Sequence, residues 1–179
     1  MRNVLFMFLL LLLSCGKDDD GYRVYTVRAG NNSCNIADVA PKIGYNQESL
    51  QFSFKTSSYW LRLDNGVWNK VFGLALGDHR ESSCRVGVKA VLCFLDFSMF
   101  VHKDGEFDWV IIGRYPADGT YYVDMGLVGT EWWMWFDGEC YKMPASQKKG
   151  IMPNYICRPF VGGDKTKVIG YDWDVWIKF

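Results

Sequence analysis

Residues 97–114 have the sequence FSMFVHKDGEFDWVIIGR, and this stretch decides the fold. Two runs rich in β-branched and aromatic residues, 97–102 and 106–114, flank a turn at 103–105. The turn contains Asp104 and Gly105, which tolerate the positive φ angles of a tight hairpin. The stretch therefore predicts two antiparallel strands joined by a short turn.

The same kind of pattern continues on both sides of this hairpin. Residues 50–55 alternate strictly, so that Leu50, Phe52 and Phe54 are expected to face a core. Residues 59–63 also alternate and predict a short strand, and Asp137-Gly138 predicts a second hairpin. Further strands are expected over 71–77, 85–94, 121–125, 131–136, 139–143, 155–160 and 171–178, with 22–28 as a candidate edge strand.

About eleven short strands with turn residues between them predict an all-β fold. Runs such as 85–94, which are apolar on both faces, favour two packed sheets over one open sheet. We therefore expect an antiparallel two-sheet sandwich of the jelly-roll or concanavalin-A-like type, formed by residues 22–179 as a single domain. The aromatic content of 17% and the 18 glycines suit short strands joined by tight turns.

The N-terminus has the pattern of a signal peptide. Arg2 precedes an uncharged apolar run over residues 4–13, whose ten residues rise about 15 Å as a helix. A bilayer core is about 30 Å thick, so this run is too short to span it. Leu12-Leu13-Ser14-Cys15 resembles the lipobox of bacterial lipoproteins. The resemblance implies cleavage of residues 1–14 and acylation of Cys15, which is the predicted lipid attachment site and membrane contact.

The segment 15–21 that follows is a predicted tether, since Asp18, Asp19 and Asp20 repel one another and favour solvent. It is similar to the acidic stretch that directs lipoproteins of Bacteroidota to the outer leaflet of the outer membrane. The resemblance implies a lipid-anchored outer-membrane protein that faces the cell exterior.

Charge and cysteine content limit the partners. The chain has 20 basic and 20 acidic residues and no basic stripe, so we expect no nucleic-acid partner. Once Cys15 is lipidated an odd number of cysteines remains, which leaves at least one thiol free or paired between chains. Their spacings match no zinc pattern. The remaining cysteines are Cys34, Cys84, Cys93, Cys140 and Cys157, and buried free thiols are expected for most of them.

A family resemblance covers roughly residues 48–179. It is carried by the order of short motifs, namely 68–73, a charged turn containing His79, 84–87, Asp137-Gly138, Met143-Pro144, 155–163 and a final alternating strand. This order is similar to that of uncharacterised concanavalin-A-like β-sandwich proteins of gut Bacteroidota. The resemblance implies a fold, and fold alone does not give a function.

No catalytic residues are assigned from the sequence. Glu106-Phe107-Asp108 resembles the start of the catalytic strand in laminarinase-type glycoside hydrolases, but no carboxylate follows on that strand for a retaining mechanism. A polysaccharide lyase requires a His or Tyr base and a cation that neutralises a uronate. Candidates for that chemistry are His79, Arg80 and Arg85, with Tyr121 or Tyr122 as the acid.

No cofactor is assigned apart from the lipid. Asp172 and Asp174 share one face of a predicted strand and, like the acidic run of the tether, carry oxygens suited to calcium. Calcium requires six to eight oxygen ligands, and two alternating aspartates are more often a solvated face.

Two tryptophans on polar strand faces suggest a ligand surface. Trp176 lies among Asp and Lys, and Trp60 lies beside Arg62. Flat aromatic rings flanked by hydrogen-bonding groups suit sugar rings. We therefore predict non-catalytic binding of glycan or another surface ligand through Trp60, Arg62 and Trp176, with polysaccharide as the partner. The alternatives are a polysaccharide lyase or hydrolase around His79, and a structural or adhesive subunit that uses an exposed sheet edge.

Overall fold

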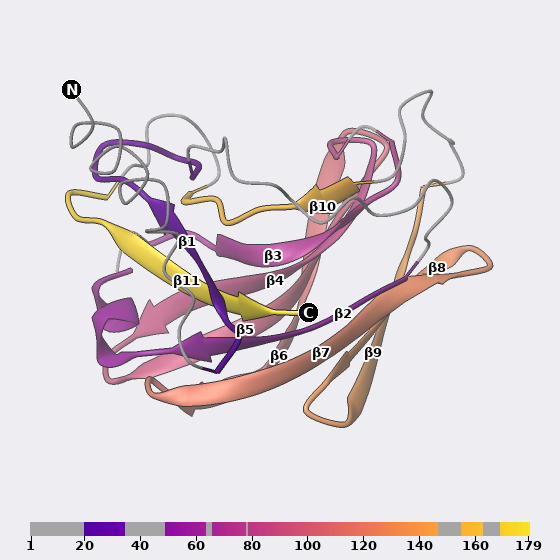
Figure 1. Ribbon diagram of the computed structural model, residues 1–179. Coiled ribbons are helices and arrows are strands. Elements are labelled where there is room, and N and C mark those ends of the chain that lie inside the picture. Colours follow the sequence, from indigo (N-terminus) through magenta and orange to yellow (C-terminus); the bar gives the residue numbers. More distant parts are fainter. Residues whose placement is uncertain (1–19, 35–48, 64–65, 78, 147–154, 163–168) are drawn as a thin grey trace, which may run out of the picture.

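The computed structural model describes residues 20–34, 49–63, 66–77, 79–146, 155–162 and 169–179 (Figure 1). The predicted signal peptide, Cys15 and most of the acidic tether lie outside these residues. The described elements are β1 (Arg23–Val27), β2 (Ser49–Thr56), the 3-10 helix η1 (Ser58–Arg62), β3 (Asn69–Ala75), β4 (Ser82–Val91), β5 (Phe94–Lys103), β6 (Glu106–Pro116), β7 (Gly119–Val128), β8 (Glu131–Phe136), β9 (Glu139–Pro144), β10 (Tyr155–Cys157) and β11 (Trp173–Lys178). Among these residues no helix is long and apolar enough to cross a bilayer.

The strands form two antiparallel sheets packed face to face. The six-stranded sheet has the order β1-β11-β2-β7-β8-β9, and the five-stranded sheet has the order β10-β3-β4-β5-β6 (Figure 1). The predicted all-β, two-sheet sandwich is confirmed. Residues 22–28, predicted as an edge strand, contain β1 at the edge of the six-stranded sheet.

Both predicted hairpins form with the expected backbone. Asp104 and Gly105 have φ of 54° and 86°, and Asp137 and Gly138 have φ of 46° and 91°. Positive φ at both central residues matches the right-handed twist of the flanking strands, which is why these dipeptides join strands so tightly. The first hairpin pairs β5 with β6 along ten residues of each strand.

Residues 59–63 are not a strand, contrary to the prediction. They fall mainly within η1, where the amide of Leu63 donates to the carbonyl of Trp60. A 3-10 turn brings residues three apart onto one side, so Trp60 and Leu63 are both buried while Tyr59 is exposed. Alternation over only five residues does not distinguish this turn from a strand.

The core lies between the sheets and is rich in aromatic rings. Phe54 of β2 contacts Phe97 of β5 at 5.6 Å and Tyr121 of β7 at 5.4 Å between ring centroids. Phe136 of β8 joins the same cluster, 5.3 Å from Phe97. Rings from both sheets therefore interlock, which aligns the two layers.

The five cysteines after Cys15 are free thiols. Cys34, Cys84 and Cys157 are buried, Cys93 is exposed and Cys140 is half-buried. Buried free thiols are therefore the majority, as expected. Burial raises the pKa of the Cys84 and Cys157 thiols, so neither has thiolate character at neutral pH.

Replacing Trp60 by alanine is predicted to lower the free energy of unfolding by about 3–5 kcal/mol, because a fully buried aromatic side chain leaves a cavity. The matched control is Tyr59→Ala, whose exposed ring predicts a change of about 0.5 kcal/mol or less. Urea unfolding followed by tryptophan fluorescence measures both. Equal effects of the two substitutions would contradict the position of Trp60 in the core.

Candidate functional site

The three predicted ligand contacts do not form one surface. Trp60 is 1% exposed, and its indole nitrogen donates to the backbone carbonyl of Asp174 at 3.1 Å. The expectation that Trp60 lies on an exposed polar face is therefore wrong, because η1 turns the ring into the core. Arg62 is exposed and stacks 4.0 Å from the ring centroid of Tyr171. Trp176 is half-buried on β11. Within the described chain no hydrogen bond, ion pair or ring contact joins any two of the three, and ligand contact by Arg62 and Trp176 stays a prediction.

The strongest candidate site lies on the outer face of the five-stranded sheet. Its residues on β3, β4 and β5 alternate with core residues, and its residues on β6 lie opposite those on β5. We call this surface the basic aromatic face. It consists of Lys70, Arg85, Phe100, His102, Phe107 and Trp109. Register confirms the grouping, since Phe100 lies opposite both Arg85 and Trp109, and His102 lies opposite Phe107.

Lys70 is a buried cation at the base of this face. It is 5% exposed, and its Nζ donates to the carbonyls of Trp68 at 2.9 Å and Gly162 at 3.1 Å. The ammonium also lies 4.3 Å from the ring centroid of Phe100. Burial, together with the positive charge of Arg85, lowers the pKa of Lys70 to about 8. Lys70 therefore remains mostly charged near neutral pH, at an energetic cost.

Arg85 is the second buried cation. It is 7% exposed, and its Nε has no hydrogen-bond partner among the described residues. Gly73 lies opposite Arg85 in register, and only glycine fits there. A Cβ at this position would lie 2.8 Å from the Arg85 Cγ. In the part of the chain that the structure describes, neither Lys70 nor Arg85 forms an ion pair with a carboxylate. Two charges therefore lie under this face without a carboxylate partner among the described residues.

A stack of aromatic rings covers the edge of the face. The ring of Phe100 is nearly parallel to that of Trp109, with an interplanar angle of 5° and centroids 6.2 Å apart. Phe107 lies at 16° to Phe100 with centroids 5.6 Å apart. Phe100 is buried, whereas Phe107 and Trp109 are exposed on β6, the edge strand. The face therefore offers two flat rings to solvent beside a positive interior.

His102 lies between the cations and the rings. Desolvation, followed by the charges of Arg85 and Lys70 and by His79 and Arg80, lowers the pKa of His102 to about 4. The imidazole is therefore neutral at pH 7.

A serine fixes the tautomer of this imidazole. The Ser83 hydroxyl donates its proton to the carbonyl of His79 at 2.7 Å, so its oxygen accepts from Nδ1 of His102 at 3.3 Å. This arrangement leaves the lone pair on Nε2, which can accept a proton.

The structure brings together some of the lyase candidates and separates others. His79 lies 6.5 Å from His102 between ring centroids, and Arg80 and Arg85 both act on the pKa of His102. Tyr121 packs inside the core, and Tyr122 is exposed on the six-stranded sheet. Neither tyrosine shares the face of the histidines.

The acidic candidates are placed as surface groups. Glu106 and Asp108 are exposed on β6. Asp172 accepts from the amide of Ala29 and forms an ion pair with Arg28, which together hold its pKa below the usual range. Asp174 accepts from the Thr26 hydroxyl. Within the described ranges no group of three or more His, Cys, Asp or Glu residues is arranged to hold a metal ion.

Sequence reasoning missed Lys70, Phe107 and Trp109. A signal was present, since Lys70 and Arg85 are charges inside runs made mostly of apolar or small residues. Such residues on a strand buried on both faces are uncommon and need a partner. The stacking of Phe107 and Trp109 on Phe100 depends on the β5–β6 register, which the hairpin at 103–105 sets.

Comparisons with known proteins identify the fold. No family model and no curated protein matches the sequence. Among solved structures, a family 7 alginate lyase from Zobellia galactanivorans has a TM-score of 0.53 at 9% identity, covering 90% of this chain and 76% of that one. The laminarinase catalytic domain from Thermotoga maritima has a TM-score of 0.52 at 12% identity, covering 92% and 78%. A family 16 endo-glucanase from Bacteroides ovatus has a TM-score of 0.50 at 13% identity, covering 90% and 81%.

The chain has a concanavalin-A-like jelly-roll fold. At these identities the likeness extends to the fold alone. The predicted jelly-roll class is therefore confirmed.

The neutral state of His102 predicts acid lability. An ordinary histidine takes up a proton near pH 6.5, and folded His102 does so only near pH 4, so the unfolded chain binds more protons between these values. The contribution of neutral His102 to the free energy of unfolding is therefore fully present above pH 6.5 and is lost as the pH falls through 4. The full shift is reduced by partial solvent exposure, which leaves an effect of about 1–2 kcal/mol.

Urea unfolding of the wild type and of His102→Asn at pH 7.0, 5.5 and 4.5 measures this effect. The difference between the two proteins is expected to shrink as the pH falls. A constant difference at all three values would contradict a neutral His102.

Proposed function

We propose that this protein binds an acidic polysaccharide on the basic aromatic face. The observation that carries the proposal is a pair of buried cations, Lys70 and Arg85, that have no carboxylate partner among the described residues. The exposed rings of Phe107 and Trp109 lie on the same face. A uronate sugar can interact with both the cations and the aromatic rings of this surface. Its carboxylate provides the counter-charge, and its C–H face stacks on an aromatic ring.

The charges favour an anionic ligand because they are poorly solvated. An uncompensated buried charge costs several kcal/mol, and much of that cost is recovered when an anion approaches through a medium of low dielectric. The exposed rings lie on the same side of the sheet as the cations, with Trp109 on β6 two strands from Arg85 and three strands from Lys70. An oligosaccharide that runs across the strands from Trp109 would therefore pass over β4 and β3. This arrangement favours a charged glycan over a neutral one.

The structural neighbours support a carbohydrate ligand. Alginate lyases, a laminarinase and an endo-glucanase share this fold. Alginate is a polymer of uronates and laminarin is a neutral glucan, so the pair of polymers tests the charge preference directly.

Arg85→Met is predicted to lower the affinity for alginate tenfold or more, since a hydrogen bond between charged groups contributes about 1.5–3 kcal/mol. Stability is expected to stay level or to rise, because the substitution removes a buried charge that repels Lys70. Isothermal titration calorimetry with alginate and with laminarin measures the affinities, and urea unfolding measures the stability.

The matched control is Arg28→Met, which removes an exposed guanidinium outside the basic aromatic face. A second pair compares Trp109→Ala with Trp135→Ala, because the two rings have similar exposed fractions, 41% and 45%, on different sheets. Wild-type affinity for alginate in Arg85→Met and Trp109→Ala would overturn the proposal, as would a loss of laminarin binding in Arg85→Met equal to the loss of alginate binding.

A lyase is the second candidate, and the tautomer of His102 favours it. A neutral imidazole with a free Nε2 lone pair can take the C5 proton of a uronate while Arg85 neutralises the adjacent carboxylate. The electrons of the C5–H bond then form a C4–C5 double bond as the C4–O bond breaks, and the departing oxygen takes a proton from water, which leaves an unsaturated sugar. Incubation with alginate and measurement of ultraviolet absorbance separates the two functions, because binding alone releases no unsaturated product and His102→Asn would abolish any that forms.

We further propose that Cys15 carries the lipid that holds this domain at the outer membrane, facing the cell exterior. Asp20, at the end of the predicted tether, forms an ion pair with Lys55, and its carbonyl accepts from Nζ of Lys178. These contacts hold Asp20, in the described part of the predicted tether, against the six-stranded sheet. An exterior position would give the basic aromatic face access to polysaccharide outside the cell.

Cys15→Ser is predicted to abolish acylation and to move the protein from the membrane to the soluble fraction. Mass spectrometry of the wild type is expected to show a chain that begins at residue 15 with added acyl mass. Antibody labelling of intact cells tests surface exposure. Recovery of an intact Met1 on the wild-type chain would contradict the anchor.

A further inference from the structure

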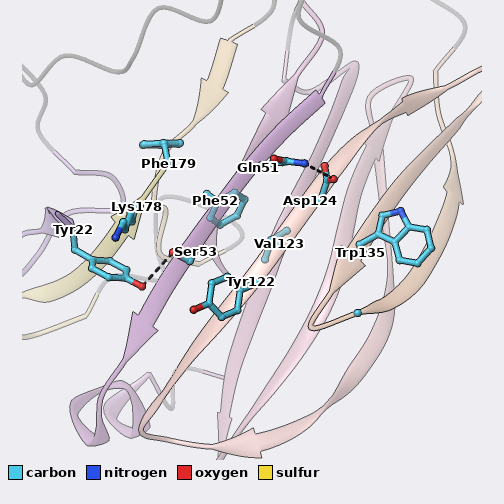
Figure 2. Close-up of a pocket in the computed structure, with 11 residues that line it drawn as sticks. Tyr22, Gln51, Phe52, Ser53, Tyr122, Val123, Asp124, Trp135, Lys178 and Phe179 are labelled. Carbon is cyan, nitrogen blue, oxygen red and sulfur yellow. Dashed lines mark hydrogen bonds between the residues drawn. The ribbon is translucent and has the colours of Figure 1, made fainter. Parts of the chain in front are cut away.

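A second surface with different chemistry lies on the opposite sheet. A cavity of about 470 Å³ opens on the outer face of the six-stranded sheet, where β2, β7 and β8 run beside the end of β11 (Figure 2). This volume falls in the range of small-molecule sites. The lining side chains used below are Tyr22, Gln51, Tyr122, Asp124, Trp135 and Lys178.

Strand register aligns three of these groups in one row. Gln51 of β2 lies opposite Asp124 of β7, which lies opposite Trp135 of β8. Neighbouring strands are about 4.8 Å apart, so an amide, a carboxylate and an indole follow one another at roughly the width of a sugar ring. Figure 2 shows the Gln51–Asp124 pair in the centre of the surface and the indole to one side.

The polar pair is held in place and still has capacity to bind. Gln51 donates through Nε2 to the Asp124 carboxylate at 2.8 Å. The Gln51 carbonyl oxygen and the second Asp124 oxygen have no hydrogen-bond partner within the described part of the chain. Two fixed acceptors beside a flat ring suit the hydroxyl groups of a sugar, which need partners close to the stacking surface.

A second row closes the other side of the cavity. Lys178 of β11 lies opposite Ser53 of β2, which lies opposite Tyr122 of β7. The hydroxyl of Tyr22 is within hydrogen-bond distance of the Ser53 hydroxyl, at 3.2 Å. Tyr122 is largely exposed, so a second aromatic ring borders the cavity. The cavity therefore has polar groups on two sides and two aromatic rings, Tyr122 on β7 and Trp135 on β8.

The balance of charge sets the class of ligand. The lining contains one carboxylate, Asp124, and one ammonium, Lys178. This balance contrasts with the basic aromatic face, where two buried cations have no described carboxylate partner. We propose that this cavity is a second carbohydrate site, specific for neutral sugars, so that the domain binds two chemically different glycans on opposite sheets.

The test uses the mature protein and a panel of neutral hexasaccharides, namely laminarihexaose, cellohexaose, mannohexaose and xylohexaose. At least one is expected to bind with a dissociation constant of 1 mM or lower by calorimetry. Trp135→Ala and Asp124→Ala are each expected to weaken that binding at least tenfold. Both side chains lie on the outer sheet face, so unfolding midpoints in urea are expected to stay near wild type.

Trp109→Ala is the matched control, since it removes a ring of similar exposure from the other sheet. It is expected to leave neutral-sugar binding unchanged, and Trp135→Ala is expected to leave alginate binding unchanged. The second site is overturned if no hexasaccharide binds, if binding survives both Trp135→Ala and Asp124→Ala, or if Trp109→Ala abolishes it. Alginate binding by Trp109→Ala tests only the basic aromatic face, and hexasaccharide binding by Trp135→Ala tests only the cavity. The two proposals can therefore fail independently.

Discussion

The aromatic contact between the two sheets is the constraint on which the rest of this molecule depends. Phe54, Phe97, Tyr121 and Phe136 come from β2, β5, β7 and β8 and meet in one cluster. In a strand each inward residue sets the outward direction of its neighbours. Because Phe97 faces the core, Ser98 and Phe100 lie on the outer face of the sheet. The β5–β6 pairing shifts register once, between Phe97 and Ser98. The core therefore determines which polar groups reach solvent.

The two outer faces that result differ in charge and in exposure. On the five-stranded sheet, β3 and β4 are covered on both faces, and Lys70 and Arg85 lie in buried positions next to aromatic rings. On the six-stranded sheet, Gln51, Asp124 and Trp135 lie in an open row with balanced charge. Burial strengthens electrostatic interactions and raises the cost of an unpaired charge. The first face is therefore suited to a charged ligand, and the second is suited to hydrogen bonds and stacking.

The sequence predicts the sandwich well because the relevant signals are local. Asp104-Gly105 and Asp137-Gly138 demand tight turns, and the alternation over 50–55 assigns Phe52 and Phe54 to the core. The strand number agrees with the prediction, but one member differs, since 59–63 belong mainly to η1 and β1 takes the place of that strand in the count. Five residues cannot separate a period of two from a period of three.

The candidate sites are harder to predict because they depend on strand register. A strand over 59–63 would place Trp60 on a polar, exposed face, whereas η1 turns its ring into the core. Arg85, Phe100 and Trp109 become neighbours through two pairings, β4 with β5 and β5 with β6. The row from Gln51 to Trp135 needs two pairings as well, one of which joins strands about seventy residues apart. No single stretch of sequence contains either arrangement.

The most direct test of the account is a crystal structure of the protein with a mannuronate oligosaccharide. We expect a sugar ring stacked on Trp109 or Phe107, with its carboxylate directed toward the strands that carry Arg85 and Lys70. An oligosaccharide bound only in the cavity of the six-stranded sheet, or one whose carboxylates all face solvent, would contradict the role assigned to the buried cations.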